Sequence, residues 1–155
     1  MPVIHVPSDY PTIALAVANS APGDTILVSD SYAGNETVTI TVENLTISAP
    51  AAVGGIDLIL GAGISSITLG GASNIDVTGN GLDNTIIGNA GDNRLDGGGG
   101  QDRYHGLAGN DVFVGGGGVD KDIADYRLDA RTVVLWALSP INPLPTFRVG
   151  SLPTP

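Results

Sequence analysis

The sequence contains no cysteine, which excludes disulfide bonds and thiolate metal sites. Aromatic residues make up only 5% of the 155 residues, although apolar residues as a whole make up 42%. The apolar positions are therefore filled mostly by Val, Ile, Leu and Ala, whose side chains suit a thin core. A chain of this length forms one domain with a modest core. If such a domain is extracellular, it needs a source of stability other than disulfides, and bound metal is one.

Basic residues are scarce as well, with six Lys and Arg against 16 acidic residues and a net charge of −10. This charge argues against nucleic acid as a partner, because phosphate groups require Lys and Arg. Glutamate is also rare: of the 16 acidic residues, only Glu36 and Glu43 are Glu, and the other 14 are Asp. Ten of the 14 Asp lie between Asp76 and Asp129. Short carboxylates concentrated in one region indicate metal ligands that reach from turns, rather than a solvated surface.

Long apolar runs are absent, so the sequence predicts no membrane span. Met1 to Tyr10 has neither the basic segment nor the apolar stretch of a secretory signal peptide. The last 17 residues, 139–155, contain five prolines, which excludes a helix there.

Glycine, by contrast, is abundant, with 23 residues, many of them in units of nine. From Gly97 to Asp120 the chain repeats Gly-Gly-x-Gly-x-Asp-x-U-x, where U is a large apolar residue. One unit is complete, the next has Leu107 in place of the second glycine, and the third begins at Gly115. A flexible linker needs no such period, so the pattern predicts a solenoid. The apolar residues that recur every nine positions are Val77, Ile86, Leu95, Tyr104 and Phe113.

These units resemble the RTX, or haemolysin-type, calcium-binding repeats of secreted bacterial proteins. The resemblance implies a parallel β-roll with two strands in each coil, whose turns bind Ca²⁺ through Asp side chains and backbone carbonyls. Positions 18 residues apart then stack on the same side. The stacked pairs are Asp102 with Asp120, Asn93 with Asp111, and Asn84 with Asp102.

The predicted ligands follow from this stacking. The Asp102/Asp120 site has two carboxylates and is expected to be the strongest, and the Asn93/Asp111 site is expected to be weaker. Two extra residues follow the third unit, so Asp122 is an alternative to Asp120. We expect two to four Ca²⁺, with Kd of roughly 10⁻⁴–10⁻³ M, and metal binding coupled to folding. The side-chain ligands are Asp102, Asp111, Asp120, Asp122, Asn93 and Asn84, and the implied carbonyl ligands are Gly97, Gly99, Gly106, Ala108, Gly115 and Gly117.

Asn84 and Asn93 also allow a second interpretation, in which their amides form ladders that hold the stack with little or no metal.

The first half of the chain has a different pattern. The segment APGDTILV at Ala21–Val28 resembles the strand that enters the coils of pectin-lyase-like right-handed parallel β-helix proteins. Before it, Ile13–Asn19 has the apolar spacing of a helix, with Asp9 as the predicted N-cap. In the resembling proteins such a helix covers the open end of the core. Short β-branched segments between turn residues predict strands, at Val3–Val6, Thr25–Val28, Glu36–Ile40 and Asn44–Ser48.

The predicted fold class is therefore all-β, a right-handed parallel β-helix/β-roll solenoid with a short N-terminal capping helix. No linker separates the two halves, so we expect one continuous solenoid in which wider coils lead into a tighter calcium roll. Its parts are β-helix coils with the cap at 1–77, a calcium β-roll at 78–126, and a terminal strand with a Pro-rich tail at 127–155.

Function is predicted to be structural rather than catalytic. β-Elimination and epimerisation of uronates commonly use Lys or Arg, and no basic residue precedes Arg94. The expected role is a secreted, calcium-binding solenoid that self-associates as a homo-oligomer or filament in a fibre, adhesin or surface layer. The resemblance implies an extracellular or cell-surface location reached by type I secretion. The initial methionine and the cap at the first residues favour this role.

The alternative is a non-catalytic RTX module, or a fragment, of a secreted polysaccharide-modifying enzyme of the alginate epimerase or lyase type. The abrupt C-terminus favours this alternative, and polysaccharide would then be a partner.

Overall fold

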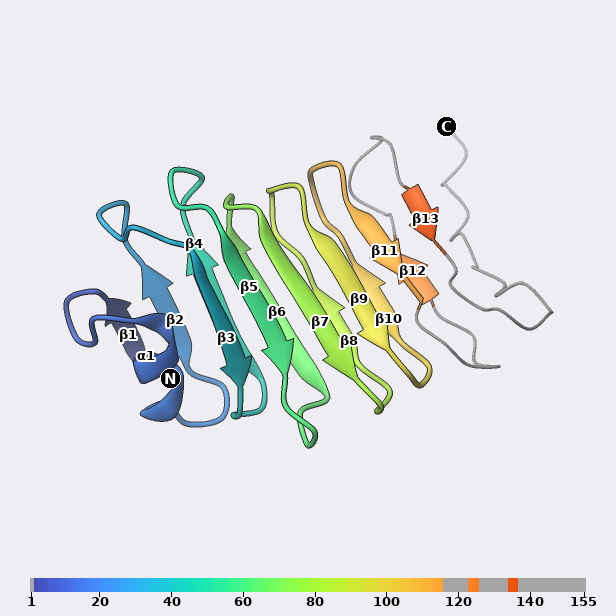
Figure 1. The fold of residues 1–155 in the computed structure, drawn as a ribbon, viewed down its shortest axis with the longest axis horizontal. Helices are drawn as coiled ribbons and strands as arrows, with labels where there is room; N and C mark the ends of the chain where they lie inside the picture. The colour runs from blue at the N-terminus through green and yellow to red at the C-terminus, as the bar shows by residue number, and fades with distance from the viewer. Residues whose placement is uncertain (1, 116–122, 126–133, 137–155) are drawn as a thin grey trace.

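Short segments of alternating apolar and polar residues form a ladder of parallel strands in the computed structural model, which describes residues 2–115, 123–125 and 134–136 (Figure 1). Apolar side chains point inward at every second position, as in Ile56–Leu60, where buried and exposed residues alternate. The strands are β1 Val3–Val6, β2 Thr25–Val28, β3 Glu36–Ile40, β4 Leu45–Ala49, β5 Ile56–Leu60, β6 Ser66–Gly71, β7 Ile75–Asn80, β8 Thr85–Ile87, β9 Arg94–Gly98, β10 Arg103–His105, β11 Val112–Val114, β12 Ile123–Asp125 and β13 Val134–Trp136.

Two parallel sheets face each other across the core. One sheet has the strand order β1-β2-β4-β6-β8-β10-β12, and the other has the order β13-β11-β9-β7-β5-β3. From β2 onward, strands that follow one another in the sequence alternate between the sheets, so the chain winds as a solenoid of about six turns. This confirms the predicted all-β parallel solenoid. The likeness of the first half to pectin-lyase-like proteins, and the boundaries at 77 and 126, remain predictions.

From β1 to β11 the coils become shorter along the chain, as the sequence predicts. Val3 pairs with Thr25, which is 22 residues later, whereas Thr85 pairs with Arg103, which is only 18 later. Apart from β9, the strands of the short coils have three residues, because a nine-residue unit contains only one x-U-x triplet. The decrease in length therefore marks where the nonapeptide pattern takes over.

The core is a continuous stack of aliphatic side chains that ends in two aromatic ones. Tyr104 and Phe113 are fully buried, and their ring centroids lie 5.5 Å apart at an interplanar angle of 56°. The hydroxyl group of Tyr104 donates to the carbonyl oxygen of Val114 at 2.8 Å. The calcium-type repeats thus use larger core residues than the aliphatic coils before them.

A short helix, α1 at Ile13–Ala18, covers the N-terminal end of the core and buries Ile13, Ala16 and Val17 (Figure 1). Its N-cap is Thr12, whose hydroxyl oxygen accepts from the backbone N–H of Leu15 at 3.2 Å. The predicted N-cap Asp9 is wrong, because its carboxylate accepts instead from the N–H of His5 at 2.7 Å.

The described part of the chain contains no helix long and apolar enough to pass through a membrane.

Candidate metal centre

Two series of turns stack along the two edges of the solenoid where nonapeptide units connect the sheets. The turns at 79–84 and 97–102 lie on one edge, and those at 88–93 and 106–111 lie on the other. Residues 18 apart therefore occupy equivalent places in successive coils, since β8 pairs with β10 and β9 pairs with β11 in that register.

The carboxylates that end these turns point into the stack. Asp102 and Asp111 are only 1% and 5% exposed. The backbone N–H of Asn84 donates to Asp102 Oδ1 at 2.8 Å, and the N–H of Asn93 donates to Asp111 Oδ1 at 3.0 Å. The predicted stacking of Asn84 with Asp102, and of Asn93 with Asp111, is thus present. The predicted residues Asp120, Asp122 and Gly117 lie outside the described residues.

Asp111 has the environment of a cation ligand. Its second oxygen, Oδ2, makes no hydrogen bond or ion pair with another described residue. Burial raises the pKa of Asp111 to about 6, against the lowering effect of the Asn93 N–H, and the nearby charge of Asp92 raises it further. A buried carboxylate without a countercharge is unfavourable unless it is protonated or bound by a cation.

Backbone and amide oxygens also converge between stacked turns on both edges. A Cβ atom placed on Gly88 would lie 2.6 Å from the carbonyl oxygen of Gly106, 2.9 Å from Asn93 Oδ1 and 3.2 Å from the carbonyl oxygen of His105. On the other edge, a Cβ on Gly79 would meet the carbonyl oxygen of Gly97 and Asn84 Oδ1.

Glycine at these two places leaves room for several hard oxygens to approach each other, which is the ligand type that Ca²⁺ prefers. Two of the predicted carbonyl groups, those of Gly97 and Gly106, are among them.

The remaining described carbonyl candidates lie in or after the same turns. The N–H of Gly99 donates to the carbonyl oxygen of Asn80 at 2.7 Å, and the N–H of Ala108 donates to that of Asn89 at 3.2 Å. These bonds tie each turn to the one before it. Gly115 directly follows β11. Whether these carbonyls bind metal stays a prediction.

Backbone conformation distinguishes the turns at 97–102 and 106–111 from those at 79–84 and 88–93. Their second residues, Gly98 and Leu107, have φ of +85° and +69°. Their fourth residues, Gly100 and Gly109, have φ of +100° and +113°. Left-handed residues at alternating positions reorient the peptide planes between them, and glycine makes this possible at little cost. Leu107 adopts the same conformation without that advantage, so the turn geometry is imposed by the repeat.

The register after β10 confirms the predicted two-residue insertion. Arg103 pairs with Thr85 of the preceding strand at a spacing of 18, but with Ile123 of the next strand at a spacing of 20. The N–H of Ile123 donates to the carbonyl oxygen of Asp102 at 2.8 Å, as the N–H of Arg103 does to that of Asn84. Whether Asp120 or Asp122 takes the place of Asp102 in the next coil stays a prediction, because both lie outside the described residues.

A second ladder of polar side chains was not predicted. The side chains of Asn74, Asp83 and Asp92 each accept a hydrogen bond from the backbone N–H of the residue 18 positions later. Asp83 Oδ1 accepts from Gln101 at 2.8 Å, and Asp92 Oδ1 accepts from Asn110 at 2.7 Å. The available signal was a polar residue every nine positions, at Asn74, Asp83, Asp92, Gln101 and Asn110.

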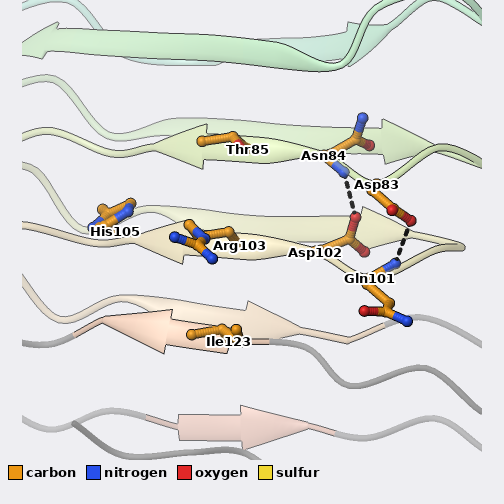
Figure 2. A pocket seen from close by; sticks show the side chains of 8 residues that line it. All are labelled: Asp83, Asn84, Thr85, Gln101, Asp102, Arg103, His105 and Ile123. Atoms are coloured by element: carbon orange, nitrogen blue, oxygen red, sulfur yellow. Dashed lines mark hydrogen bonds between the residues drawn. The ribbon is translucent and has the colours of Figure 1, made fainter.

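Beside one edge, a groove of about 600 Å³ runs over the outer side of β8, β10 and β12 (Figure 2). Thr85, Arg103 and Ile123 line it in one column, since they are register partners. Arg103 forms no ion pair with another described residue, whereas Arg94 pairs with Asp96 at 3.0 Å. The lining residues are Asp83, Asn84, Thr85, Gln101, Asp102, Arg103, His105 and Ile123.

Side chains alone do not form a metal site in the described ranges, where no three His, Cys, Asp or Glu gather at one point. The oxygens that converge at Gly79 and Gly88 are in keeping with a site made mainly of backbone carbonyls and completed by one or two side chains.

Comparison with known proteins agrees with this geometry. A family model described as an RTX calcium-binding nonapeptide repeat, in four copies, matches residues 78–113 and 105–121. No curated protein and no solved structure matches the chain. The matched residues contain all four stacked turns described above, and RTX nonapeptide repeats bind calcium. Residues 78–121 therefore carry RTX-type calcium-binding nonapeptide repeats, which continue the parallel β-solenoid.

Proposed function

We propose that the protein is a secreted structural solenoid whose C-terminal coils fold when Ca²⁺ binds, and that it has no catalytic activity of its own. The observation that carries this proposal is the buried carboxylate of Asp111, which has no countercharge among the described residues. In the absence of calcium this group opposes folding at neutral pH. Calcium at about tenfold above Kd would add roughly 1.4 kcal/mol of stability for each site.

Secretion is supported by the repeats, because RTX repeat proteins are typically secreted. Type I export to the outside or the cell surface would place the chain where calcium is near the expected Kd. Calcium binding would then act as a folding signal after export.

A structural role is supported by the distribution of apolar surface. Leu27 and Ile59 project from the outer faces of the two sheets and are 38% and 40% exposed. Helix α1 covers the N-terminal end, so we propose that copies associate through the opposite end or through these faces, as in a fibre, adhesin or surface layer. Exposed strands at a sheet edge readily add further strands.

Circular dichroism during a calcium titration, with magnesium as the control, tests calcium-dependent folding. We expect a calcium-specific gain of β signal near millimolar concentration. Size-exclusion chromatography and electron microscopy of the calcium-loaded protein then test self-association, for which we expect large species or filaments. No response to calcium would refute the folding proposal, and a lasting monomer would refute self-association.

A second candidate function is a non-catalytic module of a secreted polysaccharide-modifying enzyme. The groove favours it, because Arg103 lines it, forms no ion pair with another described residue and could bind the carboxylate of an acidic sugar. Affinity electrophoresis with alginate tests this. We expect retardation of a calcium-loaded monomer, which Arg103→Ala abolishes and Arg94→Ala does not, since Arg94 already pairs with Asp96. Equal retardation of all three proteins would exclude the groove.

A further inference from the structure

The turns of the repeat block fall into two chemical classes. The turns at 79–84 and 88–93 have asparagine at their second and sixth positions, Asn80 with Asn84 and Asn89 with Asn93. The turns at 97–102 and 106–111 have no amide at these positions and carry Asp at the sixth. A side-chain amide has two N–H donors, whereas a carboxylate only accepts. The two classes therefore require different partners in the coil before them.

The amides of the first class donate to backbone carbonyls of the preceding coil. Asn80 Nδ2 lies 2.7 Å from the carbonyl oxygen of Gly61 and 2.6 Å from that of Ile64. The nitrogen thus bridges two carbonyl oxygens across the coil boundary. Asn84 Nδ2 adds a third contact, to the same Ile64 oxygen at 3.1 Å.

The opposite edge repeats this arrangement. Asn89 Nδ2 lies 3.1 Å from the carbonyl oxygen of Gly70 and 3.0 Å from that of Ser73. Asn93 Nδ2 donates to the carbonyl oxygen of Ile75 at 3.0 Å. Both asparagines are buried. The same bridge on both edges is a property of the turn sequence rather than of one local contact.

The backbone changes at the same place as the side chains. Asn80 pairs in register with Gly98, yet Gly98 has φ of +85° and Asn80 is not left-handed. On the other edge, Leu107 is left-handed and Asn89 is not. Alternating left-handed residues appear only in the class that lacks the amide donors, within these four turns. The two classes thus differ in backbone and in side chain together.

We propose that Asn80 and Asn89 take the place of calcium ions, so that the calcium stack begins only at the turns that end in Asp102 and Asp111. Their amide nitrogens supply the positive partial charge that carbonyl oxygens of the preceding coil would otherwise receive from a cation. The coil boundaries before residues 79 and 88 are then closed without metal, and the aliphatic half stays folded when calcium is removed. This inference rests on calcium binding by the later turns.

Conversion of one turn tests the inference directly. Asn89→Gly combined with Asn93→Asp changes GNAGDN to GGAGDD, which matches the calcium-type unit. We expect native mass spectrometry across a calcium titration to show one more Ca²⁺ per chain than the unmodified protein binds. The matched control is Asn74→Asp, which adds one negative charge on the same edge and leaves both amides in place. It is expected to add no ion.

The outcomes separate this inference from the proposed function. If the unmodified protein binds calcium and the double variant binds the same number, the amides do not exclude ions and the inference is wrong. An additional ion in the Asn74→Asp control would also overturn it, because charge alone would then explain the gain. If the unmodified protein binds no calcium, the calcium-dependent function itself fails.

A pair of single variants covers the case in which the double variant does not fold. Asn89→Ala removes the bridge to Gly70 and Ser73, so we expect Tm to fall by a similar amount in chelator and in calcium. Asp111→Asn is expected to reduce only the rise in Tm that calcium produces. If Asn89→Ala instead reduces the calcium-induced rise, Asn89 belongs to an ion site and the inference is refuted.

Discussion

At the residue scale, the pKa of Asp111 of about 6 gives the calcium-free protein a defined pH dependence. Because this pKa lies above the ordinary value of 3.8, the folded state binds the proton more tightly than the unfolded state. The stabilising effect of protonation is complete below the unfolded pKa and is lost as pH rises through the folded pKa.

We therefore expect the Tm of the calcium-free protein to fall as pH rises from about 4.5 to 7. A change of ~1 kcal/mol corresponds to about 2–4 °C for a domain of this size. Calcium should remove much of this slope, since the ion replaces the proton on Asp111. Differential scanning fluorimetry in chelator checks this, with Asp111→Asn as the control. A slope in the variant as steep as in the parent would contradict the assignment to Asp111.

The pKa of Glu43 is shifted in the opposite direction to that of Asp111, because it is lowered. Partial burial acts to raise the pKa of Glu43, but hydrogen bonds from the N–H and hydroxyl groups of Ser65 and Ser66 outweigh it and hold the pKa below its ordinary value. These bonds, of 2.7–3.2 Å, connect the turn before β4 to the segment that starts β6. The ionised form is the one they stabilise.

Glu43→Gln is accordingly expected to destabilise the protein at pH 7 by about 1 kcal/mol, a small value because the carboxylate is largely solvated. Since the folded pKa is depressed, the stabilisation is present above the unfolded pKa of 4.5 and is lost as pH falls through the folded value. Urea unfolding at pH 7 and at pH 3 measures this. The expected difference between variant and parent vanishes at pH 3, and a constant difference would contradict the electrostatic origin.

At the element scale, helix α1 is attached to the solenoid by one side chain from β3. The two oxygens of Glu36 accept from the backbone N–H groups of Ile13 and Ala14, each at 3.0 Å, and one of them also accepts from the hydroxyl of Tyr32. Desolvation by burial, followed by the bond to Glu36, raises the pKa of Tyr32 to about 12. A carboxylate at a helix N-terminus satisfies free donors there and interacts favourably with the helix dipole.

Removing the Glu36 carboxylate should weaken the attachment of helix α1 to the solenoid. We expect Glu36→Ala to lower the free energy of unfolding by about 1–3 kcal/mol, because two helix N–H groups lose their acceptor. Chemical denaturation followed by circular dichroism measures the loss, with the exposed Asp57→Ala as a control. A loss that is equal in both variants would show that Glu36 acts through net charge and not through the helix.

The cap also shows where sequence reasoning stops. The apolar spacing was enough to predict a helix at Ile13–Asn19, and the structure has Ile13–Ala18. Both Asp9 and Thr12 are residue types that cap helices, so local sequence does not decide between them. The choice depends on Glu36, which is 22–23 residues away and already supplies acceptors to the first helical N–H groups. Long-range contacts of this kind are invisible in a local pattern.

In the turns, too, the sequence predicts some contacts and not others. The nine-residue period correctly predicted that Asn84 stacks with Asp102 and Asn93 with Asp111. It did not predict the bridging role of Asn80 and Asn89, because their partners lie in coils of 19 residues or more, where the period of nine no longer applies. The nine-residue pattern identifies equivalent positions within the repeat. Predicting contacts between the repeat and the aliphatic half would also require the register between coils of different length.

At the scale of the whole molecule, the solenoid joins two parts that depend on different forces. The coils up to β6 bury aliphatic side chains in strands of four to six residues. The coils from β8 onward, apart from β9, have strands of three residues, and two carboxylates are buried in their turns. Stability in a solenoid is approximately the sum of terms for each repeat and its neighbours, so such parts need not unfold together.

This division predicts a calcium response that is localised along the chain. Hydrogen exchange followed by mass spectrometry should show loss of amide protection in chelator at the turns 97–102 and 106–111 and in β10 and β11. Strands β2 to β6 should keep their protection, because they are held by a core of buried aliphatic side chains. Magnesium in place of calcium should not restore the lost protection. Uniform loss along the chain would instead mean that the solenoid unfolds as one cooperative unit, with calcium stabilising the aliphatic coils through the interfaces between successive coils.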